Sequence, residues 1–272
     1  MSKYIDEVEF TIFDVETTGL EPENGDRIIE IAGIRMRGDE RLGVFHSLVE
    51  SGKEVSAEAF AVNRITPEML KDAPLSERVL PDFLNFSNGS VLASYNAPFD
   101  MGFLNNELGL INIKPPDSPV IDVLRMSRRL LPDLERYALC FVARELGIQT
   151  EQVHRALSDV ELTVNVFKAL RELLDEKGID DFHNFASLFG LNCSLLENIT
   201  NAKIARIQEA ISLGVRLNIK YLSRTNARVT QRDILPKEIK KDKGQAYLVG
   251  ACYLRNEERT FRIDGILHME IV

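Results

Sequence analysis

Two carboxylates separated by a single residue, Asp14 and Glu16, come directly after the apolar stretch Val8 to Phe13. If this segment is extended, both side chains project from one face of the strand, because a strand has a side-chain period of two residues. Two like charges about 4 Å apart repel by about 4 kcal/mol at an effective dielectric constant of 20. A protein that keeps such a pair usually supplies a cation or a proton, although the pair alone could also open a polar turn.

Two later segments carry further side chains that could bind a metal ion or transfer a proton. Asp100 stands near the start of an expected helix, and His154 and Asp159 precede or begin another one. Taken singly, each aspartate fits a helix cap and the histidine fits a surface residue. Together the carboxylates predict a site for two divalent ions, Mg²⁺ or Mn²⁺, which can stabilise both oxygens of a phosphodiester displacement. An imidazole titrates near neutral pH, so His154 could be the general base.

The composition indicates an ordinary water-soluble protein. The chain has 272 residues, of which 44% are hydrophobic and 28% charged, enough for one large domain or two smaller ones. Neither a membrane span nor a signal peptide is apparent. Cys140, Cys193 and Cys252 lie far apart without metal-ligand spacing. We therefore expect free thiols and a cytoplasmic location.

The formal net charge of -9 is unevenly distributed. Residues 200–272 contain 14 Lys and Arg against 8 Asp and Glu, whereas residues 1–199 contain 19 against 34. This division is compatible with an acidic domain that collects metal ions beside a basic domain that attracts nucleic acid. A solvated basic surface without any partner would give the same count.

The first two thirds of the chain predict an α/β domain over residues 1–176. Strands are expected in an antiparallel meander, followed by a short buried strand that alternates with helices. This order implies a mixed β-sheet flanked by helices. The expected strands cover residues 8–13, 28–36, 42–49 and 91–95, and the expected helices cover 76–85, 99–108, 122–131, 135–146 and 158–174.

The amino-acid pattern changes in the last third of the chain. Residues 181–211 look helical with interruptions at Gly190 and around Asn198, which predicts a helical linker over residues 177–202. Short β segments then predict a small barrel or curled sheet over residues 203–272, with basic loops around Pro236 and Gly244. These segments cover residues 216–222, 246–253, 260–263 and 268–272.

Three motifs, in this order, resemble those of the DEDDh exonucleases, a family that includes bacterial proofreading exonucleases. They are Asp14-x-Glu16-Thr17-Thr18-Gly19, Asn96-x-x-x-Asp100 and His154-x-x-x-x-Asp159. The resemblance covers about residues 7–175 and includes Asn63-Arg64-Ile65-Thr66-Pro67, Ile121-Asp122 and Arg128-Arg129-Leu130-Leu131-Pro132. It implies a ribonuclease H-like fold and hydrolysis from a 3′ end with release of nucleoside 5′-monophosphates.

The resemblance also implies a role for each matching residue. Asp14 would bridge two metal ions, Glu16 and Asp159 would complete the site of the ion that activates water, Asp100 would help hold the second ion, and His154 would be the base. Contacts to the terminal nucleotide are implied for Thr17, Thr18 and Leu20, and an ordering role for Asn96. Asp122 is expected to have a structural role. His46, His183 and His268 are expected to face solvent or to pack, without acidic partners.

Residues 203–272 resemble a WYL domain, a small SH3-like barrel associated with ligand sensing or nucleic-acid binding. The resemblance rests on Ile219-Lys220-Tyr221-Leu222-Ser223, Arg232-Asp233-Ile234-Leu235-Pro236, Tyr247-Leu248-Val249 and Arg259-Thr260-Phe261-Arg262-Ile263-Asp264-Gly265-Ile266. Two positions depart from the pattern, because Ala246 replaces the naming tryptophan and Gly265 replaces an expected arginine. A nucleic-acid or nucleotide-like ligand surface is expected at Tyr221, Arg232, Arg259 and Arg262, with a structural or dimer-forming role as the alternative.

Together these observations predict a metal-dependent 3′ to 5′ exonuclease whose basic C-terminal module binds nucleic acid or a ligand. The expected partner is a nucleic acid with a 3′ end, single-stranded DNA or RNA. One alternative is a WYL-type regulatory binding protein that uses the exonuclease fold as a scaffold. Another is a proofreading subunit that works within a polymerase complex. The motifs leave the oligomeric state open.

Overall fold

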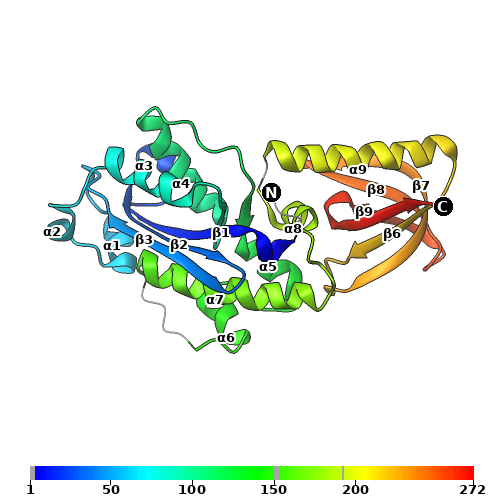
Figure 1. Cartoon of the computed structure of the whole chain (residues 1–272), viewed down its shortest axis with the longest axis horizontal. Helices are drawn as coiled ribbons and strands as arrows, with labels where there is room; N and C mark the ends of the chain where they lie inside the picture. The colour runs from blue at the N-terminus through cyan, green and yellow to red at the C-terminus, as the bar shows by residue number, and fades with distance from the viewer. Residues whose placement is uncertain (1–3, 150–153, 192) are drawn as a thin grey trace.

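The computed structural model describes residues 4–149, 154–191 and 193–272, and its two sheets lie at opposite ends of the molecule (Figure 1). The first sheet has the strand order β3-β2-β1-β4-β5. Its antiparallel part consists of β1 (Glu9–Thr17), β2 (Ile28–Arg37) and β3 (Glu40–Leu48). The short strands β4 (Val91–Ser94) and β5 (Val120–Asp122) continue the sheet in parallel. The predicted mixed sheet is therefore confirmed.

Strand β1 is longer than its apolar stretch suggests. It continues to Thr17 because β2 offers backbone partners along its whole length, with Asp14 opposite Ala32 and Glu16 opposite Glu30. The strand expected over residues 8–13 is thus present but extends four residues further, to Thr17. Asp14 and Glu16 lie inside a paired strand, so their backbone positions are fixed by the sheet.

Helices cover both faces of this sheet (Figure 1). On one face, α3 (Ser76–Ser87) and α4 (Ala97–Leu110) enclose a core with Phe13 and Phe83. The other face is covered by α5 (Val123–Leu130), α6 (Leu139–Glu145) and α7 (Ala156–Asp175), where Phe10 packs against Phe167 at a ring separation of 5.1 Å. Two short helices, α1 (Ala57–Asn63) and α2 (Pro67–Leu70), follow β3. The predicted helices are confirmed, although α6 begins later than residue 135.

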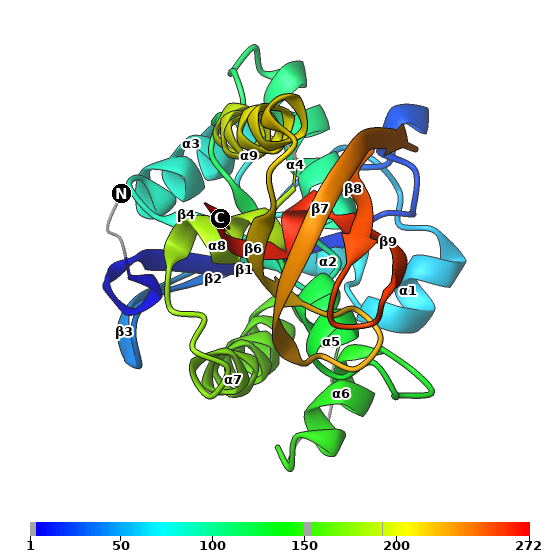
Figure 2. The ribbon, with the colours of Figure 1, turned by 90° about the vertical axis from the view of Figure 1, so that its right-hand side faces the viewer.

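The second sheet is fully antiparallel and has the order β10-β6-β7-β8-β9. Its strands are β6 (Leu217–Leu222), β7 (Val229–Asp242), β8 (Gln245–Cys252), β9 (Glu257–Arg262) and β10 (Ile266–Ile271). The expected β-rich C-terminal domain is confirmed, and the long strand β7 arches across it (Figure 2).

Strand β7 occupies a region that the sequence predicts as basic loops. Pro236 lies within it, where the register shifts between Pro236 and Glu238. The partner of Pro236 is Gly250, whose missing Cβ would lie 2.6 Å from the carbonyl oxygen of Leu235. A bulge and a glycine therefore accommodate a proline that a regular central strand would exclude.

Two helices connect the sheets. In α8 (Phe182–Phe189), Phe185 packs on Phe10 in the first core. Helix α9 (Ser194–Leu213) runs without interruption through Asn198, so the predicted break there is wrong. Leu196 near its start belongs to the first core, whereas Ile207 belongs to the core of the second sheet. No helix in the described ranges is long and apolar enough to cross a bilayer.

Candidate active site

Three carboxylates meet where the end of β1 faces the start of α7. Asp14 and Glu16 come from β1, and Asp159 lies in the first turn of α7. One oxygen of each side chain lies within 4.8 Å of an oxygen of the other two. Strand periodicity places Asp14 and Glu16 on the face that α7 covers, so the sheet and the helix together create the cluster.

Asp100 is held deeper in the fold, in the first turn of α4. Its carboxylate accepts a hydrogen bond from the backbone N–H of Val15, at 3.1 Å from Oδ1, and another from the hydroxyl of Ser94. Asn96 stands at the N-cap of α4 with a positive φ of 69°, a conformation that asparagine tolerates well. Asp100 is thereby fixed directly behind the backbone that separates Asp14 from Glu16.

The electrostatics of this cluster favour a bound cation. Burial raises the pKa of Asp14 well above its usual range, and the charges of Asp100 and Glu16 raise it further. Burial, followed by the charge of Asp159, raises the pKa of Glu16 to about 8. Burial also raises the pKa of Asp100 to about 7. A divalent cation would reverse these shifts, and the all-oxygen donor set fits Mg²⁺ or Mn²⁺.

His154 stands immediately before α7 in a left-handed backbone conformation, with a φ of 50°. Its Nδ1 lies 3.8 Å from Oδ2 of Asp159, and its side chain is 47% exposed. The imidazole therefore reaches the edge of the carboxylate cluster and remains open to solvent. The structure thus brings together Asp14, Glu16 and Asp159, with Asp100 behind them and His154 at the rim.

Sequence reasoning missed one carboxylate, Glu30. It lies opposite Glu16 on β2 with no exposed surface, and it accepts hydrogen bonds from Arg155 at 2.6 and 3.1 Å and from Ala156 N–H at 3.1 Å. Burial raises the pKa of Glu30, but the hydrogen bonds from Arg155 and His46 outweigh burial and lower it. Glu30 therefore anchors the start of α7 beside the cluster. A glutamate inside the apolar strand 28–36 was the available signal.

The same contacts correct an expectation about His46. Its Nε2 lies 2.7 Å from Oε1 of Glu30, so it has an acidic partner on the neighbouring strand. His268 likewise contacts Glu270 at 2.9 Å, and both of these side chains are exposed. Asp122 caps α5 by accepting a hydrogen bond from Leu124 N–H and lies outside the three-carboxylate cluster.

The loop after β1 carries the residues expected to contact a terminal nucleotide. The Thr17 hydroxyl donates to the carbonyl of Gly19 at 2.6 Å, and the Thr18 hydroxyl donates to Asp26 at 3.2 Å. These two threonines are buried and shape the loop, whereas Leu20 is 77% exposed. The loop therefore presents an apolar side chain to solvent, four residues after Glu16.

The four residues expected to form a C-terminal ligand surface lie in different surroundings. Tyr221 and Arg232 both contact Phe261, and Arg232 is largely buried with a hydrogen bond to Thr230. Arg259 is exposed and pairs with Glu257 at 2.6 Å. The fourth residue, Arg262, pairs with Asp264 and lines a pocket together with the arginines of α5.

Gly265, which replaces an expected arginine, has a steric explanation. A Cβ at this position would lie 2.8 Å from Nη2 of Arg129 and 2.8 Å from Cε2 of Tyr221. Arg129 reaches this space from α5, and its Nη2 donates to the carbonyl of Leu222 at 2.8 Å. A guanidinium from the first domain therefore occupies the space beside residue 265.

Comparison with known proteins agrees with this geometry. The family model for exonucleases matches residues 11–167, and the model for the WYL domain matches residues 202–271. The DNA polymerase III PolC-type of Caldanaerobacter subterraneus subsp. tengcongensis is 31% identical over 257 residues, which is 92% of this chain and 18% of the polymerase. That of Oceanobacillus iheyensis is 36% identical over 183 residues, which is 67% of this chain and 13% of the polymerase.

The fold is also similar to that of a solved exonuclease I. The TM-score is 0.59 at 15% sequence identity, over 90% of this chain and 55% of that one. The chain spans less than a fifth of the length of the curated polymerases that it matches. The match over residues 11–167 covers more than half of the 272 residues, and the chain therefore belongs to the exonuclease family and carries a C-terminal WYL domain.

Proposed function

We propose that this protein is a metal-dependent 3′ to 5′ exonuclease that hydrolyses phosphodiester bonds and releases nucleoside 5′-monophosphates. The observation that supports this most directly is the convergence of Asp14, Glu16 and Asp159 within 4.8 Å of one another, in a member of the exonuclease family. Such a cluster repels itself unless it holds cations or protons. Hydrolysis of a polyanion is the chemistry that such a centre performs best.

Two Mg²⁺ or Mn²⁺ ions, held by Asp14, Glu16, Asp100 and Asp159, would stabilise the charge that develops on the attacking and leaving oxygens. His154 takes the proton of the attacking water, because its exposed imidazole stands at the rim of the cluster. Oδ2 of Asp159 lies 3.8 Å from Nδ1 of this histidine and helps to orient the ring.

Glu30 and Arg155 position the start of α7. Arg155 follows His154 directly, and its two hydrogen bonds to buried Glu30 fix the backbone from which His154 and Asp159 project. Because catalysis depends on placement to a fraction of an ångström, this pair acts on the reaction through geometry. Its contribution is therefore one of positioning.

Exposed apolar side chains on the loop after β1 and on α1 suit an unpaired strand. Leu20 and Phe60 are 77% and 38% exposed, and the backbone N–H of Ser56 joins the α1 region to the carbonyl of Thr18 at 3.0 Å. Unstacked bases gain free energy when they pack on such surfaces. We assign contacts with the terminal nucleotide to Leu20 and the Thr17–Thr18 backbone, with Asn96 ordering the site. Single-stranded ends are the preferred substrate.

The remaining proposals concern the cellular compartment, the ligand of the WYL domain and the domain boundaries. The free thiols of Cys140, Cys193 and Cys252 are compatible with a reducing, cytoplasmic compartment. The WYL domain, within residues 203–272, binds nucleic acid or a nucleotide-like ligand through Tyr221, Arg232, Arg259 and Arg262. The first domain extends over residues 1–176, and residues 177–202 form the helical link.

The test compares wild type with Asp14→Asn on 5′-labelled single-stranded DNA, duplex DNA and RNA, with Mg²⁺, with Mn²⁺ and with a chelator. Wild type should shorten a single strand stepwise from its 3′ end only when metal is present. Asp133→Asn is the matched control, because Asp133 is an exposed aspartate outside the cluster. The proposal is overturned if the wild-type protein leaves every labelled strand intact with both metals.

A proofreading role within a polymerase complex is the second candidate. It is favoured by the similarity to PolC-type polymerases, which extends over 92% of the chain and includes the C-terminal domain. A mismatched primer terminus should then be removed faster in the presence of a replicative polymerase than in its absence. Equal rates with and without the polymerase would exclude this role.

A further inference from the structure

A pocket at the junction of the two domains is lined by arginines from both. Its volume is about 300 Å³. Helix α5 contributes three of these arginines, and the C-terminal domain contributes two. Two aspartates also line the pocket, so positive charge prevails in it. We call it the arginine pocket, and its charged lining residues are Arg125, Arg128, Arg129, Arg224, Arg262, Asp122 and Asp264.

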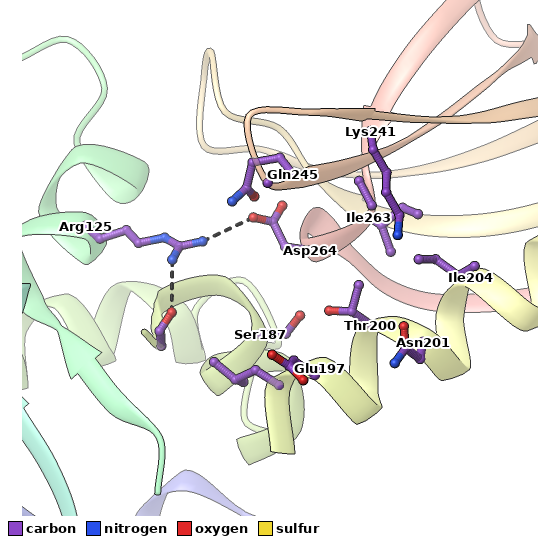
Figure 3. Close-up of a pocket in the computed structure, with 14 residues that line it drawn as sticks. Arg125, Ser187, Glu197, Thr200, Asn201, Ile204, Lys241, Gln245, Ile263 and Asp264 are labelled. Carbon is purple, nitrogen blue, oxygen red and sulfur yellow. Dashed lines mark hydrogen bonds and ion pairs between the residues drawn. The ribbon is translucent and has the colours of Figure 1, made fainter. Parts of the chain in front are cut away.

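Only part of this positive charge is neutralised within the protein. Asp264 accepts hydrogen bonds from Arg262 at 3.1 Å and from Arg125 at 3.2 Å, and Figure 3 shows Arg125 reaching from α5 to Asp264. Within the described residues, no carboxylate lies at ion-pair distance from Arg128, Arg129 or Arg224. Three guanidinium groups of the described chain therefore border the pocket without a direct ion pair, although the charge of Asp264 acts on Arg129.

Of the three arginines, Arg129 gives the strongest indication that an anion binds in the pocket. It is 8% exposed, and burial lowers its pKa to about 10. One hydrogen bond links its Nη2 to Leu222, but its buried Nε has no hydrogen-bond partner among the described residues. The charge of Asp264 offsets only part of the cost of burying this guanidinium, and an anion in the pocket would offset more of it.

The neighbouring cavity, drawn in Figure 3, differs in character. It has a volume of about 400 Å³ and shares Arg125, Gln245 and Asp264 with the arginine pocket. Its other charged lining residues are Lys241 and Glu197, which balance each other. The excess of positive charge is therefore confined to the α5 side of the Arg125–Asp264 pair.

We propose that the arginine pocket binds a phosphate group. Planar guanidinium groups pair with phosphate oxygens through two parallel hydrogen bonds, and several arginines can share one phosphate. The ligand would join α5 of the exonuclease domain to the WYL domain, because both domains supply arginines. This assignment goes beyond hydrolysis, since none of these arginines belongs to the carboxylate centre.

The phosphate could belong to the substrate strand or to a free nucleotide. Asp122, which lines the pocket, pairs in register with Ser94 on the adjacent strand, and Ser94 donates to Asp100. Adjacent strands lie about 4.8 Å apart. The pocket therefore begins close to the carboxylate centre, within reach of the backbone of a strand whose 3′ end is bound there.

The experiment measures binding by the full chain in the presence of a chelator, so that hydrolysis plays no part. The probes are a 5′-labelled oligothymidylate, thymidine 5′-monophosphate and inorganic phosphate. Arg128→Ala/Arg224→Ala is the main variant, because both side chains are exposed and their removal spares the fold. Arg144→Ala/Arg255→Ala removes the same charge from exposed positions outside the pocket.

We expect the affinity of the phosphate-bearing probe to fall at least about tenfold in the pocket variant and less than about twofold in the control. If a strand supplies the phosphate, the pocket variant should bind the oligothymidylate more weakly and with less salt dependence than wild type does. Thymidine 5′-monophosphate and inorganic phosphate should then bind neither wild type nor the variant. If a free nucleotide supplies it, the small probes lose affinity and the strand does not. The proposal is overturned if the two double variants bind all three probes equally. Arg129→Gln should show the larger loss in the same assay.

Discussion

The two domains handle charge in opposite ways. In the exonuclease domain, burial raises the pKa of Asp14, Glu16 and Asp100, and the charges of neighbouring carboxylates raise each of them further. In the WYL domain, surface charges are neutralised by neighbours, as in the pairs Lys237–Glu258 and Arg259–Glu257, both at 2.6 Å. Unrelieved repulsion between carboxylates inside a fold indicates a place for a cation, whereas locally paired surface charge gives no such indication.

The sharpest test of this difference replaces one carboxylate. We expect Asp14→Asn to lower kcat/KM on a labelled single strand by on the order of a thousandfold, because several kcal/mol of charge stabilisation are lost. The same change should raise the melting temperature of the metal-free protein, because it removes a buried repulsive charge. If activity and metal-free stability fell together, the carboxylate cluster would be a structural element.

The second test concerns the base. We expect His154→Gln to lower kcat by about a hundredfold and to flatten the acidic limb of the pH–rate profile. His183→Gln is the matched control, because His183 is exposed on α8 and should leave both quantities unchanged. An unaltered pH profile in His154→Gln would assign proton transfer to another group.

The third test uses pH without metal. Glu16 has a pKa of about 8 in the folded protein against 4.5 ordinarily, so between these values the folded state binds more protons than the unfolded state. The stability of the metal-free protein should therefore fall by a few kcal/mol as pH rises from 4.5 to about 8. Thermal unfolding at each pH measures this, and added Mg²⁺ should restore stability most at pH 8. In Glu16→Gln the slope should be smaller.

The smallest expected effect lies within the C-terminal domain. Lys203 on α9 donates to the carbonyl of Ile266 at 2.7 Å, and burial lowers its pKa from 10.5 to about 8. Between these values the unfolded state binds more protons, so stability should rise with pH by on the order of 3 kcal/mol. Replacing Lys203 by Met should remove this rise in unfolding experiments, whereas an unchanged rise would assign it to other groups.

Sequence reasoning predicted the elements whose signals are local. The strand over residues 8–13 was predicted from its pattern, and the resemblance of the three motifs grouped Asp14, Glu16, Asp100 and Asp159. The structure places Asp14, Glu16 and Asp159 within 4.8 Å of one another. Strand β5 was missed because its three residues are too short to show a period. Strand β7 was missed because a proline normally argues against a central strand, and only the bulge beside Pro236 admits it.

The parts that could not be predicted depend on contacts between distant segments. In the sequence Glu30 looks like an ordinary polar residue of a strand. Its role in anchoring the start of α7 follows only from its hydrogen bond with Arg155 in the folded protein. Gly265 looks like the loss of an anion-binding arginine, yet the space beside it is filled by Arg129. Neither relationship has a fixed spacing along the chain, because each joins two elements that meet only in the folded protein.

Helix α9 sets the relative orientation of the two domains by its length. It has 20 residues and would be about 30 Å long, with one end in each core. Each residue of an α-helix turns the chain by about 100°, so a single insertion in its middle would rotate the WYL domain by more than a quarter turn. The arginines of α5 and Arg262 would then face different directions. The number of residues in α9 is therefore itself a requirement of the junction.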